Sequence, residues 1–258
     1  VALGLAPAIA EELEGGEPTA MLLGGRALRE PMLLDAARVA AQHGVKLLAE
    51  VFPTRIERGA GLPYVERIAY LAELASVQLR GLRHLILVDA KSPVSFFAYP
   101  GKKSDLVPEG CTVHTLAAFD QDAAGSLAAL VERLDARQAA PALQPAGRPG
   151  RPRGKLTGEK VCKAIGALLP ERAIIVDEAQ TSGVLLPAFT RGAPRHDVIT
   201  LTGGAIGQGL PTAVGAAIAC PDRPVLALCG DGSAMYTLQA LWTMARERLN
   251  VISVIMNN

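Results

Sequence analysis

The sequence predicts an α/β protein with two domains, each built on a mainly parallel sheet flanked by helices. Short apolar runs that suit buried strands alternate with helical patterns along the chain, and this alternation is typical of parallel sheets covered on both faces. A stretch rich in proline, glycine and arginine, residues 141–156, interrupts the alternation. Such a composition marks an exposed connector. We therefore predict Rossmann-like domains over residues 1–140 and 157–258.

The composition is that of a globular protein and argues against several functional classes. Half of the 258 residues are apolar and the net charge is +1, which argues against a nucleic-acid or membrane partner. No apolar run approaches the ~18 residues of a membrane span. The four cysteines show no C-x-x-C spacing and suit reduced thiols. We expect a cytoplasmic protein.

In the first domain, strand-like and helical stretches alternate in the order that a parallel sheet requires. The predicted strands are 19–23, 46–52, 84–89 and 111–116, and the predicted helices are 31–43, 63–79 and 123–137. Gly24 and Gly25 follow the first strand, and Glu50 lies at the end of the second strand, where a dinucleotide site has its ribose-binding acid. However, no G-x-G-x-x-G is present. A tight turn remains the favoured interpretation.

Two further segments each leave two interpretations open. Residues 92–100 carry three aromatic side chains just past a strand, and these side chains could line a substrate pocket or form an apolar plug. The basic connector at 141–156 could be a nucleic-acid arm. In a nearly neutral chain, a solvated linker is the favoured interpretation of that connector.

The second domain continues the alternation to the end of the chain. Helices are predicted at 157–168, 212–219 and 234–248, and strands at 173–176, 198–201, 224–229 and from Val251 to just before Asn258. A strand, a crossover helix and a parallel strand place their carboxyl ends on one edge of the sheet, where α/β folds bind ligands. Asp231 and Asn258, 27 positions apart, follow two such strands. Their hard oxygen ligands suit Mg²⁺.

The residues around this pair carry a family resemblance. Gly230-Asp231-Gly232-Ser233, the spacer and the closing Asn257-Asn258 are similar to the diphosphate-binding signature of thiamine-diphosphate (ThDP) enzymes, most of all the acetolactate synthase and benzoylformate decarboxylase branch. The resemblance implies that Asp231 and Asn258 hold Mg²⁺. It also implies that Gly230, Gly232 and Ser233 lie against the diphosphate, since the glycines permit close backbone approach.

The resemblance assigns roles to two further segments. Gln180 and Thr181 follow a strand and are expected to contact the diphosphate, although Thr181 or Ser182 could instead cap the next helix. In the glycine-rich loop before Pro211, the backbone of Gly204 is expected to face the aminopyrimidine ring, and Ile206 to hold the cofactor bent.

The resemblance further implies a ThDP- and Mg²⁺-dependent lyase or transferase that acts on a 2-oxo acid, as a homodimer or homotetramer. FAD is permitted but not indicated. The pyrimidine-binding domain and its activating glutamate lie outside this sequence, so we expect a fragment of a longer protein that is inactive alone and holds no catalytic residue. The four histidines are scattered without metal-ligand spacing. A non-catalytic homologue and a flavin- or NAD-binding oxidoreductase are the alternatives.

Overall fold

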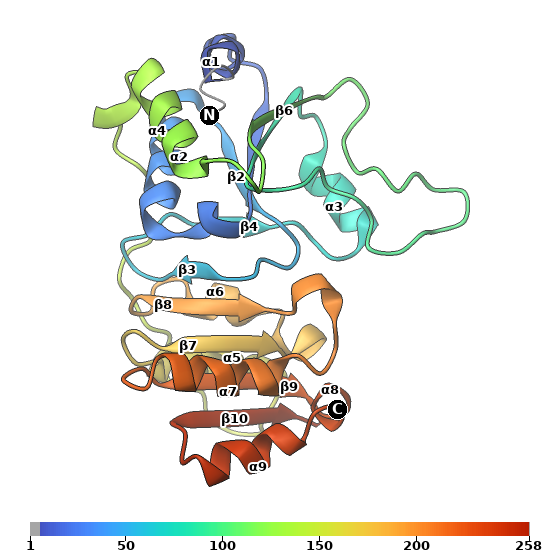
Figure 1. Ribbon diagram of the computed structural model, residues 1–258, viewed down its shortest axis with the longest axis vertical. Coiled ribbons are helices and arrows are strands. Elements are labelled where there is room, and N and C mark those ends of the chain that lie inside the picture. Colours follow the sequence, from blue (N-terminus) through green and yellow to red (C-terminus); the bar gives the residue numbers. More distant parts are fainter. Residues whose placement is uncertain (1–5, 258) are drawn as a thin grey trace. The chain divides into compact units, whose positions relative to one another are not determined.

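Two five-stranded sheets organise the chain in the computed structural model, which describes residues 6–257 (Figure 1). One unit comprises the chain up to Val51 together with residues 63–142, and the other comprises residues 52–62 and 143–258. Segment 52–62 thus groups with the C-terminal half of the chain, although most of the first unit follows it in sequence. The predicted α/β class with two mainly parallel sheets is confirmed.

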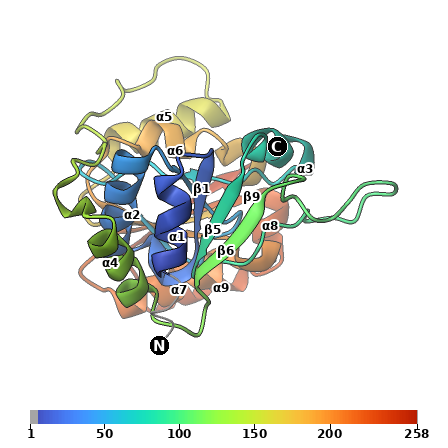
Figure 2. The ribbon, with the colours of Figure 1, turned by 90° about the horizontal axis from the view of Figure 1, so that it is seen from above.

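The first unit holds a fully parallel sheet in the order β4-β2-β1-β5-β6. Its strands are β1 (Thr19–Leu23), β2 (Lys46–Ala49), β4 (Glu66–Arg67), β5 (His84–Val88) and β6 (Thr112–Ala117), and its helices are α1 (Ala6–Glu14), α2 (Glu30–His43), α3 (Ala72–Leu79) and α4 (Ala123–Arg133), with 3₁₀ turns η1 (Gly25–Leu28) and η2 (Ala136–Gln138). Helices α1, α2 and α4 gather on one side of the sheet and α3 on the other (Figure 2). Every residue of β1 and β5 is buried, as strands covered on both faces require.

The predicted helix at 63–79 is wrong over its first half. Residues Glu66–Arg67 form the edge strand β4 beside β2, and the helix begins only at Ala72. The side chain of Gln78 stabilises this arrangement, because its Nε2 donates to Glu66 Oε1 at 2.6 Å and its Oε1 accepts from the Ala69 amide at 2.7 Å. Strand β2 is also shorter than predicted and ends at Ala49.

The second unit holds a mixed sheet in the order β10-β9-β7-β8-β3. Its strands are β3 (Ile56–Arg58), β7 (Ile174–Glu178), β8 (His196–Thr200), β9 (Val225–Gly230) and β10 (Val251–Met256), and its helices are α5 (Gly158–Leu168), α6 (Leu186–Thr190), α7 (Gly209–Ala219), α8 (Asp231–Met235) and α9 (Gln239–Arg246), with 3₁₀ turns η3 (Gln180–Gly183) and η4 (Thr202–Gly204). Only β3 runs antiparallel to its neighbour, β8. None of the helices in the described part of the chain has the length and apolar character that a membrane crossing needs.

The single helix predicted at 234–248 is wrong, because the structure divides it into α8 and α9. The amides of Tyr236 and Thr237 bond to carbonyls three residues back, which closes the first helix tightly. The hydroxyl of Thr237 donates to the carbonyl oxygen of Gly207 at 2.6 Å. This contact ties the break between the helices to the glycine-rich loop.

On β8, His196 is a buried imidazole whose pKa lies well below the ordinary histidine value. Only 3% of it is exposed, its Nδ1 lies 2.7 Å from the carbonyl oxygen of Pro194, and its Nε2 is among the buried side-chain atoms without a hydrogen-bond partner. The pKa of His196 is lowered to about 4, chiefly by burial. The charge of Arg58 acts in the same direction as burial, while the Pro194 carbonyl and Asp197 raise the pKa. The folded protein therefore holds this imidazole neutral at pH 7.

We expect His196 to make the second unit less stable as the pH falls below about 6.5. The unfolded chain binds a proton at the ordinary histidine pKa, whereas the folded chain does not until about pH 4, so protonation favours unfolding in that window. The loss should reach about 2–3 kcal/mol near pH 4.5. Urea unfolding of wild type and His196→Asn at pH 7.5 and 4.5 measures it. The variant should lose less stability than wild type by that amount, and equal losses would contradict the assignment.

Candidate functional site

The carboxyl ends of β7, β9 and β10 meet at one edge of the second sheet. Parallel pairing sets Met256 opposite Gly230, and Glu178 opposite Cys229. Asp231 directly follows β9, and Asn257 directly follows β10. The predicted ligand Asn258 lies outside the described residues. The predicted strand–helix–strand arrangement thus brings the Asp231 and Asn257 positions to the same edge.

Asp231 is the residue at which β9 passes into α8. Gly230 precedes it in an extended conformation with φ −68° and ψ 152°. The Asp231 side chain is half-buried, Gly232 is exposed and Ser233 is half-buried. Among residues 6–257 no hydrogen bond or ion pair engages the Asp231 carboxylate. Its oxygens are therefore available to a cation.

The 3₁₀ turn η3 carries Gln180 and Thr181 past the end of β7. Both are exposed, and the turn contacts β7 and the neighbouring strand β9. Neither η3 nor the following helix α6 has a side-chain cap, so the capping interpretation of Thr181 and Ser182 is wrong. The hydroxyl of Thr181 and the amide of Gln180 are chemically suited to phosphate oxygens.

The glycine-rich loop between β8 and α7 contains the two residues expected near an aminopyrimidine ring. Gly204 is half-buried with φ +70°, and the Ile206 side chain is 50% exposed. Gly207, the next residue, has φ +94°, and a Cβ there would lie 2.6 Å from the Cβ of Tyr236. The loop is thus fixed next to Ile206, and a bulky apolar side chain remains exposed to a ligand.

Nothing in the sequence marked Glu178 as the residue that fixes this loop. Glu178 is 1% exposed, and its two carboxylate oxygens accept the amides of Gly207 at 2.5 Å and Gly209 at 2.6 Å. A Cβ at Gly209 would lie only 2.5 Å from Glu178 Oε2. The sequence feature that could have indicated this role is an acidic side chain at the end of a buried strand, with a glycine-rich turn further along the chain.

A buried thiol next to Glu178 has no reactive character. Cys229 Sγ lies 3.9 Å from Glu178 Oε2. Burial raises the pKa of Cys229 to about 12, and the carboxylates of Glu178 and Asp177 act in the same direction. The thiol is protonated at pH 7 and is a poor nucleophile. Cys229 is therefore no candidate nucleophile at this edge of the sheet.

In the first unit, the turn after β1 is closed by carboxylates. Glu50 Oε1 accepts the amide of Gly25 at 3.2 Å, and Asp89 Oδ2 accepts the amide of Arg26 at 2.7 Å. Burial raises the pKa of Glu50, the Gly25 amide lowers it, and the neighbouring Asp89 raises it again. The amides that a dinucleotide diphosphate would need already have acceptors, and these acceptors would repel it. This geometry disfavours the oxidoreductase alternative.

The aromatic segment at 92–100 folds against a tyrosine of the same unit. The ring of Tyr70 lies 5.0 Å from that of Phe96 and 5.6 Å from that of Phe97, between centroids. All three side chains are 40–49% exposed. The cluster is consistent with either interpretation of this segment, a pocket lining or an apolar plug.

Comparisons with known proteins identify the family that this part of the chain resembles. The family described as "Thiamine pyrophosphate enzyme, C-terminal TPP binding domain" matches residues 179–258. IlvX of Mycobacterium tuberculosis, named as a candidate acetolactate synthase large subunit, is 58% identical over 250 residues, 97% of this chain and 48% of that protein. Benzoylformate decarboxylase of Pseudomonas aeruginosa is 35% identical over 148 residues, 53% of this chain and 26% of that protein.

A solved structure supports the fold over nearly the whole chain. The thiamine diphosphate-dependent 4-hydroxybenzoylformate decarboxylase of Rhodococcus jostii RHA1 superposes with a TM-score of 0.74 at 24% identity, covering 98% of this chain and 50% of that one. The chain therefore spans about half the length of IlvX and of this decarboxylase.

Proposed function

Since the chain belongs to the thiamine-diphosphate enzyme family, in its acetolactate synthase and benzoylformate decarboxylase branch, we propose that it binds ThDP and Mg²⁺ at the carboxyl edge of the second sheet. One observation carries this proposal. The Asp231 carboxylate, which has no hydrogen-bond or ion-pair partner among residues 6–257, lies at the end of β9. This position is next to the end of β10, on the sheet edge where η3 also begins. Carboxylate and amide oxygens suit Mg²⁺.

Each predicted residue has a role in holding the cofactor. Asp231 and Asn258 would bind Mg²⁺, while Gln180, Thr181 and Ser233 would donate to diphosphate oxygens. Gly204 and Ile206 would support the ring from the loop that Glu178 anchors. When bound, thiamine diphosphate supplies a ring that takes up the electron pair released as a 2-oxo acid loses CO₂. This chain's residues orient the cofactor.

We propose that the whole protein acts on a 2-oxo acid as a homodimer or homotetramer. Exposed apolar side chains support self-association, since Met235, Tyr236 and Trp242 are 63–67% exposed on α8, α9 and the turn between them. The activating glutamate would come from a segment outside this sequence. The 258-residue chain by itself is therefore expected to release no CO₂ from pyruvate or benzoylformate, and sustained release would refute this.

Replacing Asp231 by alanine should weaken ThDP binding in the presence of Mg²⁺ by about 100-fold or more, because a charged ligand of the metal is lost. Isothermal titration calorimetry of the full-length protein measures the affinity. Asp222→Ala is the matched control, since Asp222 is exposed in an ion pair with Arg172 before β9 begins. Equal affinities for Asp231→Ala and wild type would contradict the assignment of Asp231 as a ligand of Mg²⁺. Tight binding without turnover of any 2-oxo acid would favour the non-catalytic homologue.

A further inference from the structure

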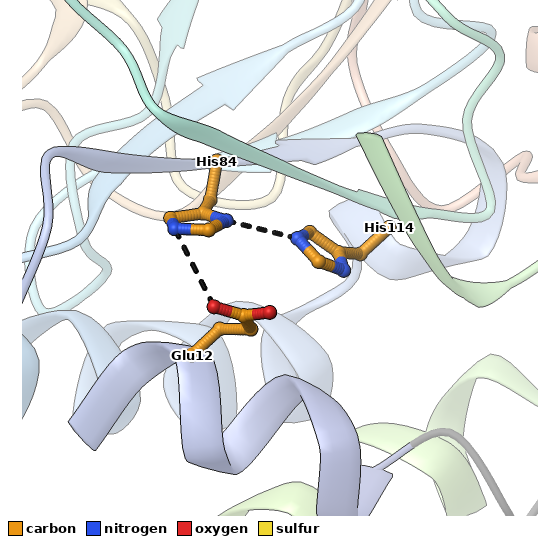
Figure 3. A group of neighbouring side chains, drawn as sticks. All are labelled: Glu12, His84 and His114. Carbon is orange, nitrogen blue, oxygen red and sulfur yellow. Dashed lines mark hydrogen bonds and ion pairs between the residues drawn. The ribbon is translucent and has the colours of Figure 1, made fainter. Parts of the chain in front are cut away.

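Two histidines and a glutamate come together in the first unit, although they are far apart in sequence (Figure 3). His84 opens β5, His114 lies in β6, and Glu12 lies on α1. Because β5 and β6 pair in parallel with His84 opposite Thr112, His114 stands two positions further along on the same face. One ligand atom from each of the three side chains lies within 4.8 Å of the others.

The two imidazoles are held in direct contact. His84 Nδ1 lies 3.0 Å from His114 Nε2, and the His84 side chain is only 8% exposed. The other nitrogen of His84, Nε2, lies 2.9 Å from Glu17 Oε2 and 3.6 Å from Glu12 Oε2. The cluster therefore offers a buried imidazole, a half-buried imidazole and an exposed carboxylate.

The contact with Glu17 determines which ring nitrogen of His84 carries the proton. An ionised carboxylate only accepts hydrogen bonds, so the bond at 2.9 Å requires the proton of neutral His84 to be on Nε2. The lone pair of Nδ1 then faces His114. A carboxylate that orients the remote nitrogen of a histidine in this way is a recurring feature of metal-binding imidazoles.

We propose that Glu12, His84 and His114 bind one divalent transition-metal ion of the Zn²⁺ class, with Glu17 as the positioning residue. Tetrahedral bonds of about 2.0–2.1 Å place ligand atoms roughly 3.3 Å apart, and the two imidazole nitrogens are already close to that separation at 3.0 Å. The ion would replace the proton that bridges them, and that proton would move to His114 Nδ1 through solvent.

The donor set selects the class of ion. Two imidazoles and one carboxylate favour Zn²⁺, Co²⁺, Ni²⁺ or Cu²⁺ over Mg²⁺ and Ca²⁺, which prefer oxygen ligands. In this structure Glu12 Oε2 lies 3.6 Å from His84 Nε2, on the side of the ring away from His114 (Figure 3). The exposed side chain of Glu12 on α1 would therefore change rotamer to reach an ion between His84 Nδ1 and His114 Nε2. Three protein ligands leave the fourth position of a tetrahedral ion to water.

Titration of the 258-residue chain with Zn²⁺ by calorimetry, in excess Mg²⁺ to occupy oxygen-rich sites, tests the proposal. Wild type should bind one ion with micromolar or tighter affinity. His114→Ala and Glu12→Gln should each weaken it, the former by more than about 100-fold, and Glu17→Gln by about 10- to 100-fold. His43→Ala is the matched control and should bind as wild type does, since His43 lies at the end of α2 outside the cluster.

Co²⁺ provides a second readout that does not depend on affinity alone. Its visible absorption should become intense as the ion enters a tetrahedral site, and it should be lost in His114→Ala while circular dichroism shows an unchanged fold. Because His84 is buried, the half-buried His114 and exposed Glu12 are the decisive positions. Absence of saturable Zn²⁺ binding by wild type, or equal binding by wild type and His114→Ala, would reduce the pair to a structural hydrogen bond and overturn the proposal.

Discussion

Replacing Glu178 by alanine is expected to destabilise the second unit by about 2–5 kcal/mol, because it leaves two buried amides without an acceptor. Those amides belong to Gly207 and Gly209, both buried, and each is bound by one oxygen of this carboxylate. The loop that carries Gly204 and Ile206 should lose its anchor at the same time. ThDP affinity should therefore fall together with stability.

Urea unfolding followed by circular dichroism measures the loss of stability. Glu178→Gln keeps one carbonyl acceptor, so its free energy of unfolding should lie between those of wild type and Glu178→Ala. Glu171→Ala is the surface control, because Glu171 is exposed in the same unit, and its effect should stay within about 0.5 kcal/mol. A wild-type midpoint for Glu178→Ala would show that water or another group satisfies both amides.

The buried strands were predictable because continuous burial leaves a continuous apolar run. Strand β1 matches its predicted range at both ends, and β5 differs by one residue. Both are buried at every position, so the period-2 pattern disappears and only length and flanking turns define them. The parallel arrangement then follows from the helices between them.

The parts that were not predictable depend on contacts distant in sequence. The strand β3 exists because residues 56–58 pair with β8, about 140 positions later, and nothing local in Ile56–Arg58 indicates this. The edge strand β4 forms because β2 offers it a partner and Gln78 holds its side chain and the following amide. The break between α8 and α9 depends on the bond from Thr237 to Gly207.

The same distinction divides the site residues. Asp231 was predictable because a local motif, Gly-Asp-Gly after a strand, places it at the sheet edge. Glu178 was not, because its partners are amides of a loop about 30 positions later. His84 and His114 become neighbours only through the register of β5 and β6, which spacing along the chain does not reveal.

Replacing Gly166 by alanine should destabilise the second unit by about 3 kcal/mol or more, because there is no room for a methyl group between two helices. Gly166 lies in α5, and a Cβ there would lie 2.2 Å from the carbonyl oxygen of Phe189 in α6 and 2.8 Å from its carbon. A backbone carbonyl cannot rotate aside as a side chain can. Helix α6 would have to move away from α5, or α5 would have to bend.

Gly215→Ala provides the opposite result from the same chemical change. Gly215 lies in α7 of the same unit, it is exposed, and a Cβ there would meet nothing within 4 Å. Because alanine favours the helix over glycine, this variant should gain about 0.5–1 kcal/mol. Urea midpoints of the two variants should therefore shift in opposite directions from wild type. A rise in both midpoints would mean that helix propensity, and not the close approach of α5 to α6, decides the effect at Gly166.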